Sequence, residues 1–327
     1  MAQLTYRDAV AAGMAQEMRR DPNVVLLGED VAAAGGVFKA TVGLLDEFGA
    51  KRVKDTPISE QAIVGAAMGA AMTGLRPVVD LMFSDFFAVC WDIVANQIAK
   101  TRYMTDGQVT LPLVIRSANG AGSRFGAQHS QSVENWAMTI PGLKIVAPAF
   151  PGDVKGMLAA AIRDEDPVLF FEQKSLYATK GEVPDGEHVI ELGKANVIRE
   201  GTDVTIVCHS KTVVPALKAA ELLAGDHGVS AEVVDLRSLR PLDEHTLLAS
   251  VLKTGRCVVA EEGWPHCGIG AQVVDIVQRE AFDSLDAPVL RVTQADVPMP
   301  YNKVLERAAK PSVEKIAAAA RRVLYLD

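Results

Sequence analysis

The sequence has few cysteines, no basic run and no long uninterrupted apolar stretch, and each absence excludes a class of protein. Its four cysteines lack metal-type or redox-type spacing, and most lie in apolar runs, as buried thiols of a reducing compartment do. The net charge of −8 argues against a nucleic-acid-binding surface and suits a basic protein partner. The most apolar helical segment is interrupted by Arg76 and Pro77 within about 20 residues, too soon for a membrane span. The first residues have no signal or transit character, so we expect a cytoplasmic protein.

Familiar nucleotide and catalytic motifs are also missing. Gly268 and Gly270 follow an apolar run, but Val273 stands where the third glycine of a dinucleotide fingerprint belongs. A tight turn from strand to helix explains the same glycines. The chain has no phosphate-binding P-loop, no metal-type His–Cys cluster and no nucleophile elbow. A nicotinamide-dependent oxidoreductase is therefore disfavoured.

At 327 residues the chain is long enough for two domains, each with its own core. Short apolar runs alternate with helical segments, which is typical of a largely parallel sheet covered on both faces. Between Tyr177 and Glu200 the apolar periodicity fades, and Gly, Pro, Asp and Glu dominate. We therefore predict two doubly wound α/β domains, at 1–185 and 201–327, joined by a linker at 186–200.

The individual elements follow from apolar runs and capping residues. The expected strands lie at 24–27, 52–54, 78–82, 113–115, 145–146, 168–171, 204–207, 231–234, 257–260 and 289–292. The expected helices are one capped by Thr5 and running to Met18, one ending near Phe48, and others at 60–73, 85–103, 213–224 and 243–253, then one opening at Gly268 and an alanine-rich C-terminal one.

The helix at 60–73 begins in an unusual way. Pro57 makes a turn, Ser59 is the expected N-cap, and Glu60 is the first helical residue. An acid in the first turn could do no more than complement the helix dipole. Small side chains leave one helix face almost bare, so another backbone can approach it closely. They are Ala62, Gly65, Ala66, Gly69 and Ala70.

Together with Gln128–Gln131 and Pro141–Lys144, this stretch resembles the beta chain of the thiamine-diphosphate-dependent 2-oxoacid dehydrogenases. The resemblance extends from Leu27–Asp30 to Asp296–Tyr301, nearly the whole chain. It implies a pyrimidine-binding domain followed by a transketolase C-terminal-like domain. It also implies a function, decarboxylation of a 2-oxoacid on thiamine diphosphate and transfer of the acyl group to a lipoyl-bearing acyltransferase.

The resemblance also implies site residues. Glu60 would be the acid that hydrogen-bonds a nitrogen of the cofactor's aminopyrimidine, and His129 would transfer a proton to the substrate oxygen or to the lipoyl sulfur. Phe86 would lie against the aminopyrimidine face, although a plain core phenylalanine explains it too. Glu29 would lie along a water-filled route between paired active sites.

Relatives bind a structural potassium ion near the counterpart of residues 161–167. The corresponding ligands would be the carbonyls of Leu113, Ala161 and Asp164, with a group from Asp166. An acidic turn before a proline explains the same residues.

The family's diphosphate and magnesium motif, Gly-Asp-Gly followed by paired asparagines, is absent, and Gly225–Gly228 lacks its spacing. The resemblance therefore implies an alpha subunit that supplies Mg²⁺, in an alpha2beta2 heterotetramer. The C-terminal domain would dock onto the acyltransferase core, where the acidic end at Asp327 could meet a basic module.

The substrate stays open. Glu261–Pro265 and Ala295–Tyr301 look most like pyruvate dehydrogenases, whereas Leu81–Phe86 and Gly126–His129 are also similar to acetoin dehydrogenases. Branched-chain 2-oxoacids are less favoured. A non-catalytic dimerisation or docking scaffold is the alternative from another class, and the presence of Glu60 and His129 argues against it.

Overall fold

The computed structural model describes residues 1–326, and their contacts divide the chain into two units. The first comprises Met1–Gly120 and Trp136–Leu192, and the second comprises Ala121–Asn135 and the chain from Gly193 onward. By its contacts the loop 121–135 is grouped with the second unit, and the domain bounds 1–185 and 201–327 stay a prediction. Within the predicted linker at 186–200, Asn196–Arg199 form strand β9, since they pair with β11 of the second unit.

The first unit is built on a parallel sheet. Its strands lie in the order β6-β7-β5-β4-β2-β3, and each pairs in parallel with its neighbour, which confirms the predicted sheet. Their bounds are β2 Val24–Gly28, β3 Val53–Asp55, β4 Arg76–Phe83, β5 Val114–Asn119, β6 Lys144–Val146 and β7 Val168–Gln173. An outlying pair, β1 (Ala2–Thr5) and β8 (Lys180–Val183), is antiparallel.

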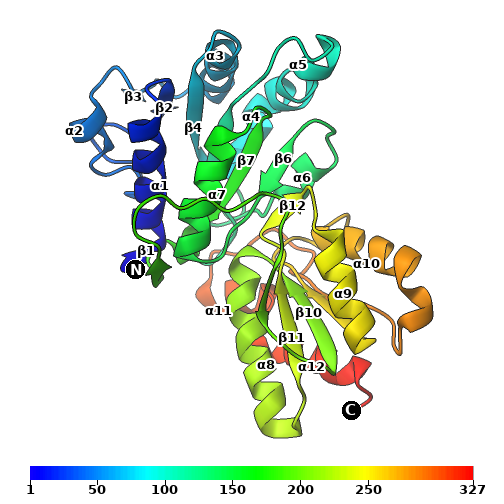
Figure 1. Cartoon of the computed structure of the whole chain (residues 1–327). Coiled ribbons are helices and arrows are strands. Elements are labelled where there is room, and N and C mark those ends of the chain that lie inside the picture. The colour runs from blue at the N-terminus through cyan, green and yellow to red at the C-terminus, as the bar shows by residue number, and fades with distance from the viewer. Residues whose placement is uncertain (327) are drawn as a thin grey trace. The chain divides into compact units, whose positions relative to one another are not determined.

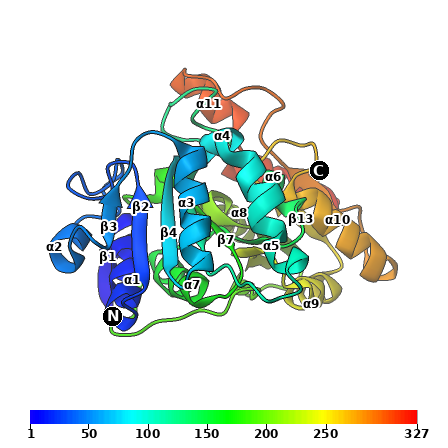
Figure 2. The same ribbon diagram turned by 90° about the horizontal axis from the view of Figure 1, so that it is seen from above.

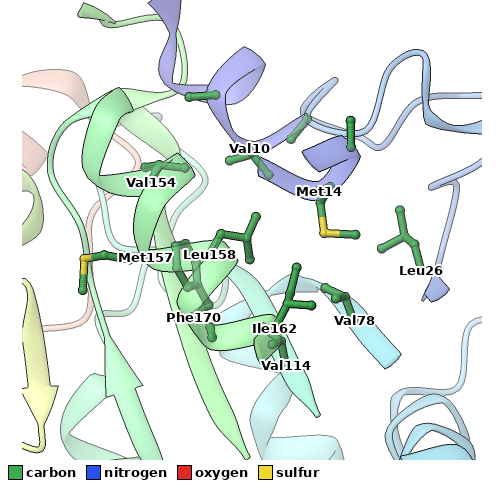
Figure 3. Packing of buried hydrophobic residues seen from close by; sticks show 14 of the residues in the cluster. Val10, Met14, Leu26, Val78, Val114, Val154, Met157, Leu158, Ile162 and Phe170 are labelled. Atoms are coloured by element: carbon green, nitrogen blue, oxygen red, sulfur yellow. The ribbon is translucent and has the colours of Figure 1, made fainter. Parts of the chain in front are cut away.

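Helices α1 (Tyr6–Arg20) and α7 (Pro151–Arg163) lie side by side on one face of this sheet (Figure 1). Val10 and Met14 of α1 and Leu158 of α7 pack there with strand residues such as Leu26 and Val78 (Figure 3). Alternate strand residues face the other way. On that side α3 (Glu60–Met72) packs beside β4 (Figure 2).

The predicted helix at 85–103 is not continuous. A 3₁₀ turn (Ser84–Phe86) leads into α4 (Phe87–Asp92), a π-helical segment (Ile93–Ile98) and α5 (Ala99–Met104). Two backbone carbonyls of this segment accept contacts from side chains. The Cys90 thiol contacts the Phe86 carbonyl, and the Lys100 ammonium bonds the Ala95 carbonyl. Such inserted contacts account for bends in a helix. Short helices α2 (Leu44–Phe48) and α6 (Glu134–Met138) complete this part of the chain.

The second unit has its own sheet, in the order β14-β13-β10-β11-β9. The strands are parallel except β9, which is antiparallel to β11. The strand bounds are β10 Val204–Cys208, β11 Ala231–Asp235, β13 Cys257–Ala260 and β14 Leu290–Val292. The short strand β12, at Ser238–Arg240, is not part of this five-stranded sheet. The helices are α8 Val213–His227, α9 Glu244–Thr254, α10 Ile269–Glu280, α11 Lys303–Ala309 and α12 Val313–Val323. In residues 1–326 no helix is both long and apolar enough to cross a membrane.

The glycines that begin α10 accommodate a buried carboxylate. A Cβ atom on Gly268 or Gly270 would lie 2.3 or 2.6 Å from the Glu261 carboxylate oxygens. Glu261 is 1% exposed, and its Oε1 accepts a 2.6 Å bond from Nη2 of Arg291. The pair of glycines therefore serves a tight strand-to-helix turn rather than a dinucleotide.

Candidate active site

Three of the predicted site residues follow the carboxyl ends of adjacent parallel strands in the first unit. Glu29 follows β2, Glu60 comes after β3, and Phe86 follows β4. The strand ends are neighbours in register, since Gly28 pairs with both Asp55 and Asp80. This is the edge at which open parallel sheets bind their ligands.

Glu60 is held in an unusual state for a buried acid. It is the first residue of α3, and only 9% of its surface is exposed. Within residues 1–326, no group donates a hydrogen bond to its carboxylate. Its carboxylate oxygens are not wholly enclosed by the protein, so a ligand can reach them.

The Glu60 charge affects the pKa values of two neighbouring groups, Glu29 and Cys90. The pKa of Glu29 is raised by burial and then by the nearby Glu60 carboxylate. Burial, together with the Glu60 charge, raises the pKa of the Cys90 thiol to about 12. Since the Cys90 thiol contacts the Phe86 carbonyl at 3.8 Å, Glu29, Glu60 and the backbone of Phe86 belong to one neighbourhood.

The Phe86 ring is half-buried and packs edge-on against Phe83, with ring centroids 5.6 Å apart and an interplanar angle of 69°. Next to it, the Ser84 hydroxyl donates a 2.7 Å bond to Oδ1 of Asn119. This bond ties the end of β4 to the end of β5. The aromatic side chain is thus positioned at the same edge as Glu60.

A buried charge network in the same sheet was missed by sequence reasoning. Arg116 of β5 is 2% exposed and donates two 2.7 Å bonds to Glu172 of β7, and it also bonds Asp80 of β4. The Tyr177 hydroxyl donates a 2.9 Å bond to Glu172. Burial lowers the pKa of Arg116, but the two carboxylates outweigh burial and raise it well above its ordinary value. A charged residue inside each apolar strand was the only signal in the sequence.

His129 lies in the second unit, on the loop 121–135, and is half-buried. Glu306 of α11 fixes this loop, because its Oε1 accepts bonds of 2.9 and 3.0 Å from the amides of Gly122 and Arg124. Gly126 has φ +76°, and a Cβ atom there would meet the Tyr301 ring at 2.5 Å. These contacts therefore hold the loop in a defined position on its own unit.

The side chains of the predicted potassium site are occupied by cations of the protein. Lys144 Nζ lies 2.7 Å from Asp164 and 3.2 Å from Asp166, and Arg102 also bonds Asp166. Burial raises the pKa of Asp166, but Arg102 and Lys144 outweigh burial and hold that pKa below its ordinary value. The Asp166 carboxylate therefore does not fit a potassium ion.

The carbonyl part of the set is compatible with a cation. Each carbonyl accepts one hydrogen bond, from Val168 N to Leu113 O at 2.9 Å, from Asp164 N to Ala161 O at 3.3 Å, and from Arg76 Nη2 to Asp164 O at 3.0 Å. A carbonyl oxygen has two lone pairs, so one remains on each. Ligation through these carbonyls stays a prediction.

The small-residue face of α3 is largely exposed. Ile63, Val64 and Ala67 are the buried side of this helix, whereas nothing lies within 4 Å of a Cβ atom placed on Gly69. The first unit thus presents a bare helix face next to Glu60.

Comparisons with known proteins agree with this architecture. The family model of the transketolase pyrimidine-binding domain matches residues 2–180, and the model of the transketolase C-terminal domain matches residues 193–316. A solved split-gene transketolase, described as an inactive beta4 tetramer, superposes with a TM-score of 0.81 at 25% identity and covers 99% of both chains. The fold and its strand-edge site therefore define a transketolase-type, thiamine-diphosphate-dependent protein.

Curated relatives narrow the class. The chain is 47% identical to the mitochondrial pyruvate dehydrogenase E1 component subunit beta-2 of Oryza sativa subsp. japonica, over 99% of this chain and 87% of the relative. It is 48% identical to the pyruvate dehydrogenase E1 component subunit beta of Rickettsia bellii, over 99% of both. It is also 47% identical to the Bacillus subtilis acetoin:2,6-dichlorophenolindophenol oxidoreductase subunit beta, over 98% and 97%. The chain belongs to the family of beta subunits of thiamine-diphosphate-dependent 2-oxoacid dehydrogenases.

Proposed function

We propose that this chain grips the aminopyrimidine of thiamine diphosphate in a pyruvate-decarboxylating enzyme and that Glu60 is the catalytic acid. The observation that carries the proposal is the Glu60 carboxylate, which is 9% exposed and receives no hydrogen bond from residues 1–326. A free carboxylate beside a half-buried phenylalanine fits an aminopyrimidine, which offers N–H donors and an aromatic face.

The bound cofactor supplies an electron sink for the electrons that carbon dioxide leaves behind. Glu60 would hold or share a proton at a nitrogen of the aminopyrimidine, and Phe86 would offer an aromatic face to it. Glu29, whose pKa is raised by burial and by the Glu60 charge, lies at the same edge and would pass a proton onward. His129 donates a proton to the substrate oxygen or to the lipoyl sulfur.

The chain acts with partners. The magnesium motif is absent from the sequence, and no group of three or more His, Cys, Asp or Glu in the described chain is arranged to hold a metal ion. We therefore assign Mg²⁺ and the diphosphate to an alpha subunit in an alpha2beta2 heterotetramer. The bare face of α3 would pack against a neighbouring chain, the C-terminal domain would dock the acyltransferase, and a potassium ion would sit on the carbonyls of Leu113, Ala161 and Asp164. Location in the cytoplasm stays a prediction.

Pyruvate is the proposed substrate because relatives named for it match the chain end to end. Acetoin is the second candidate, because a beta subunit named for acetoin is equally similar at 47% identity. The alpha subunit shares in substrate selection, so the beta chain alone does not decide between them.

Co-expression with an alpha subunit of this family tests the proposal. We expect the pair to release carbon dioxide from pyruvate with thiamine diphosphate and Mg²⁺, and the chain alone to release none. Faster turnover of acetoin by the same pair would transfer the assignment to acetoin. Decarboxylation by the chain without a companion subunit would refute the shared site.

A further inference from the structure

A small cavity of the second unit lies far in sequence from every residue placed in the chemistry. Its volume is about 250 Å³, and it is bordered by the start of α8, the chain before α12 and the first turn of α12. Its charged lining comprises Lys211, Lys218, Arg307 and Lys310, with the carboxylates of Glu262 and Glu314.

The two carboxylates of the lining compensate the four cations only in part. In the described chain none of them has an ion-pair partner within 4 Å. Arg307 lies near enough to Glu314 to lower the pKa of that carboxyl, although the Ser312 hydroxyl lowers it more. Lys211 is half-buried, and burial is the main cause that lowers its pKa. Attraction from Glu262 opposes this shift, and repulsion from Lys310 and then from Lys218 adds to it.

Burying a charged lysine beside other lysines costs stability. A depressed lysine pKa means that the charged form is less favourable in the folded chain than in the unfolded chain. An anion bound between the lysines would remove this cost. The first turn of α12 adds backbone N–H groups, which favour negative charge.

We propose that this cavity is an anion site that binds the phosphate group of a small ligand. Its volume lies just below the roughly 300–1,000 Å³ of pockets for drug-sized molecules, so it suits free phosphate or a small phosphate monoester. Lys211 and Lys310 would hold the phosphate oxygens as charged donors, and Lys218 and Arg307 would add positive potential.

The test uses the full chain at constant ionic strength maintained with chloride. Inorganic phosphate and glycerol 3-phosphate are titrated by calorimetry, and the thermal unfolding midpoint is followed in parallel. We expect saturable binding of at least one probe, with a rise in the midpoint. Lys211→Gln and Lys310→Gln should each weaken binding at least about tenfold, the loss expected for one charge-assisted contact. Lys51→Gln, at an exposed lysine of the other unit, is the matched control.

Without ligand, Lys211→Gln should have a higher unfolding midpoint than the wild type, because the cost of burying a charged group is removed. Lys218→Gln, at an exposed position, gives a second variant that tests the same cluster. Tighter binding of either probe identifies the free or the esterified form of the phosphate ligand. Absence of saturable binding at 10 mM phosphate, about the limit for a specific small-anion site, would overturn the proposal. So would an equal loss of binding in Lys51→Gln.

Discussion

Two buried carboxylates of the first unit are in opposite situations. Glu172 is 0% exposed and is satisfied by two bonds from Arg116 and one from Tyr177. Glu60 is 9% exposed and receives no hydrogen bond from residues 1–326. Burial alone therefore does not mark a functional acid. Glu60 differs from Glu172 because its oxygens stay accessible and accept no bond from residues 1–326, so they remain open to a ligand.

The positions of the two carboxylates in the fold explain the difference. Glu172 lies within β7, where strand pairing brings Arg116 of β5 alongside. Glu60 lies at the start of a helix that follows a strand, beyond the last pair of the sheet. One side chain stabilises the sheet, whereas the other is presented at the edge where ligands bind.

The largest expected effect is on catalysis. In the complex with the alpha subunit, Glu60→Gln should reduce turnover by about 10²–10⁴-fold, the usual contribution of a positioned acid or base. Stability should change by less than about 1 kcal/mol, because the lost helix-dipole attraction opposes the relieved repulsion with Glu29. Carbon dioxide release and urea unfolding measure the two quantities. Glu165→Gln, at an exposed carboxylate of the same unit, is the control for both.

Near-normal turnover in Glu60→Gln would remove this residue from the mechanism. The difference in hydrogen bonding between Glu60 and Glu172 would then not mark a functional acid. A loss of folding in that variant would instead make Glu60 a structural acid like Glu172.

The second prediction concerns Glu172 and the stability of the folded protein. Glu172→Gln should lower the free energy of unfolding by about 3 kcal/mol, since Arg116 loses a charged partner in the core. The loss is at the lower end of the range for broken buried pairs because Asp80 still faces Arg116. Urea unfolding measures it. Glu165→Gln breaks an exposed pair of similar length, 2.8 Å, and should cost less than about 1 kcal/mol. Equal costs in the two variants would contradict the comparison.

The sequence predicted the parallel strands to within a few residues, because apolar runs and caps are local signals. Thr5 caps α1 as expected, with Oγ1 accepting a 3.2 Å bond from the Asp8 amide. The features that the sequence did not predict depend on residues far away along the chain. Strand β9 exists through its pairing with β11, and Arg116 meets Glu172 across 56 residues of chain.

In the candidate site, too, some features could be predicted from the sequence and others could not. Glu60, Phe86 and Glu29 could be chosen from motifs, and the parallel sheet explains why they share one edge. The missing donor to Glu60 could not be predicted, because it depends on side chains that the fold brings near or keeps away. The same holds for Lys144 and Arg102, which occupy the carboxylates of the predicted potassium site.

The third prediction concerns the buried side chains of His209 and Glu134 in the second unit. This pair is less fully bonded than Glu172 but, unlike Glu60, has a partner within the chain. Nε2 of His209 lies 3.8 Å from Oε1 of Glu134, and both side chains are buried. Burial lowers the pKa of His209, but Glu134, then Glu261 and Asp235, outweigh burial and raise it.

A raised folded pKa stabilises the protein below the unfolded pKa of histidine, about 6.5, and this stability is lost as pH rises through the folded pKa. Between pH 6 and 8.5 the wild type should therefore lose stability that His209→Asn does not lose. Thermal unfolding across this range measures the difference. Parallel pH profiles of the two proteins would show that the pair contributes nothing.

The smallest expected effect tests whether Glu60 and Glu29 share one electrostatic site. Burial is the main cause of the raised pKa of Glu29, and the Glu60 charge is the next, followed by Asp30 and Asp80. Glu60→Gln should therefore lower the pKa of Glu29 only part of the way toward its ordinary value. Glu172→Gln, which leaves Glu60 in place, should leave the shift caused by Glu60 intact. Carboxyl ¹³C chemical shifts of Glu29, followed against pH in the wild type and both variants, measure this. An unchanged pKa in Glu60→Gln would mean that the two acids do not sense each other. Glu60 would then lack the partner through which a proton could leave the site.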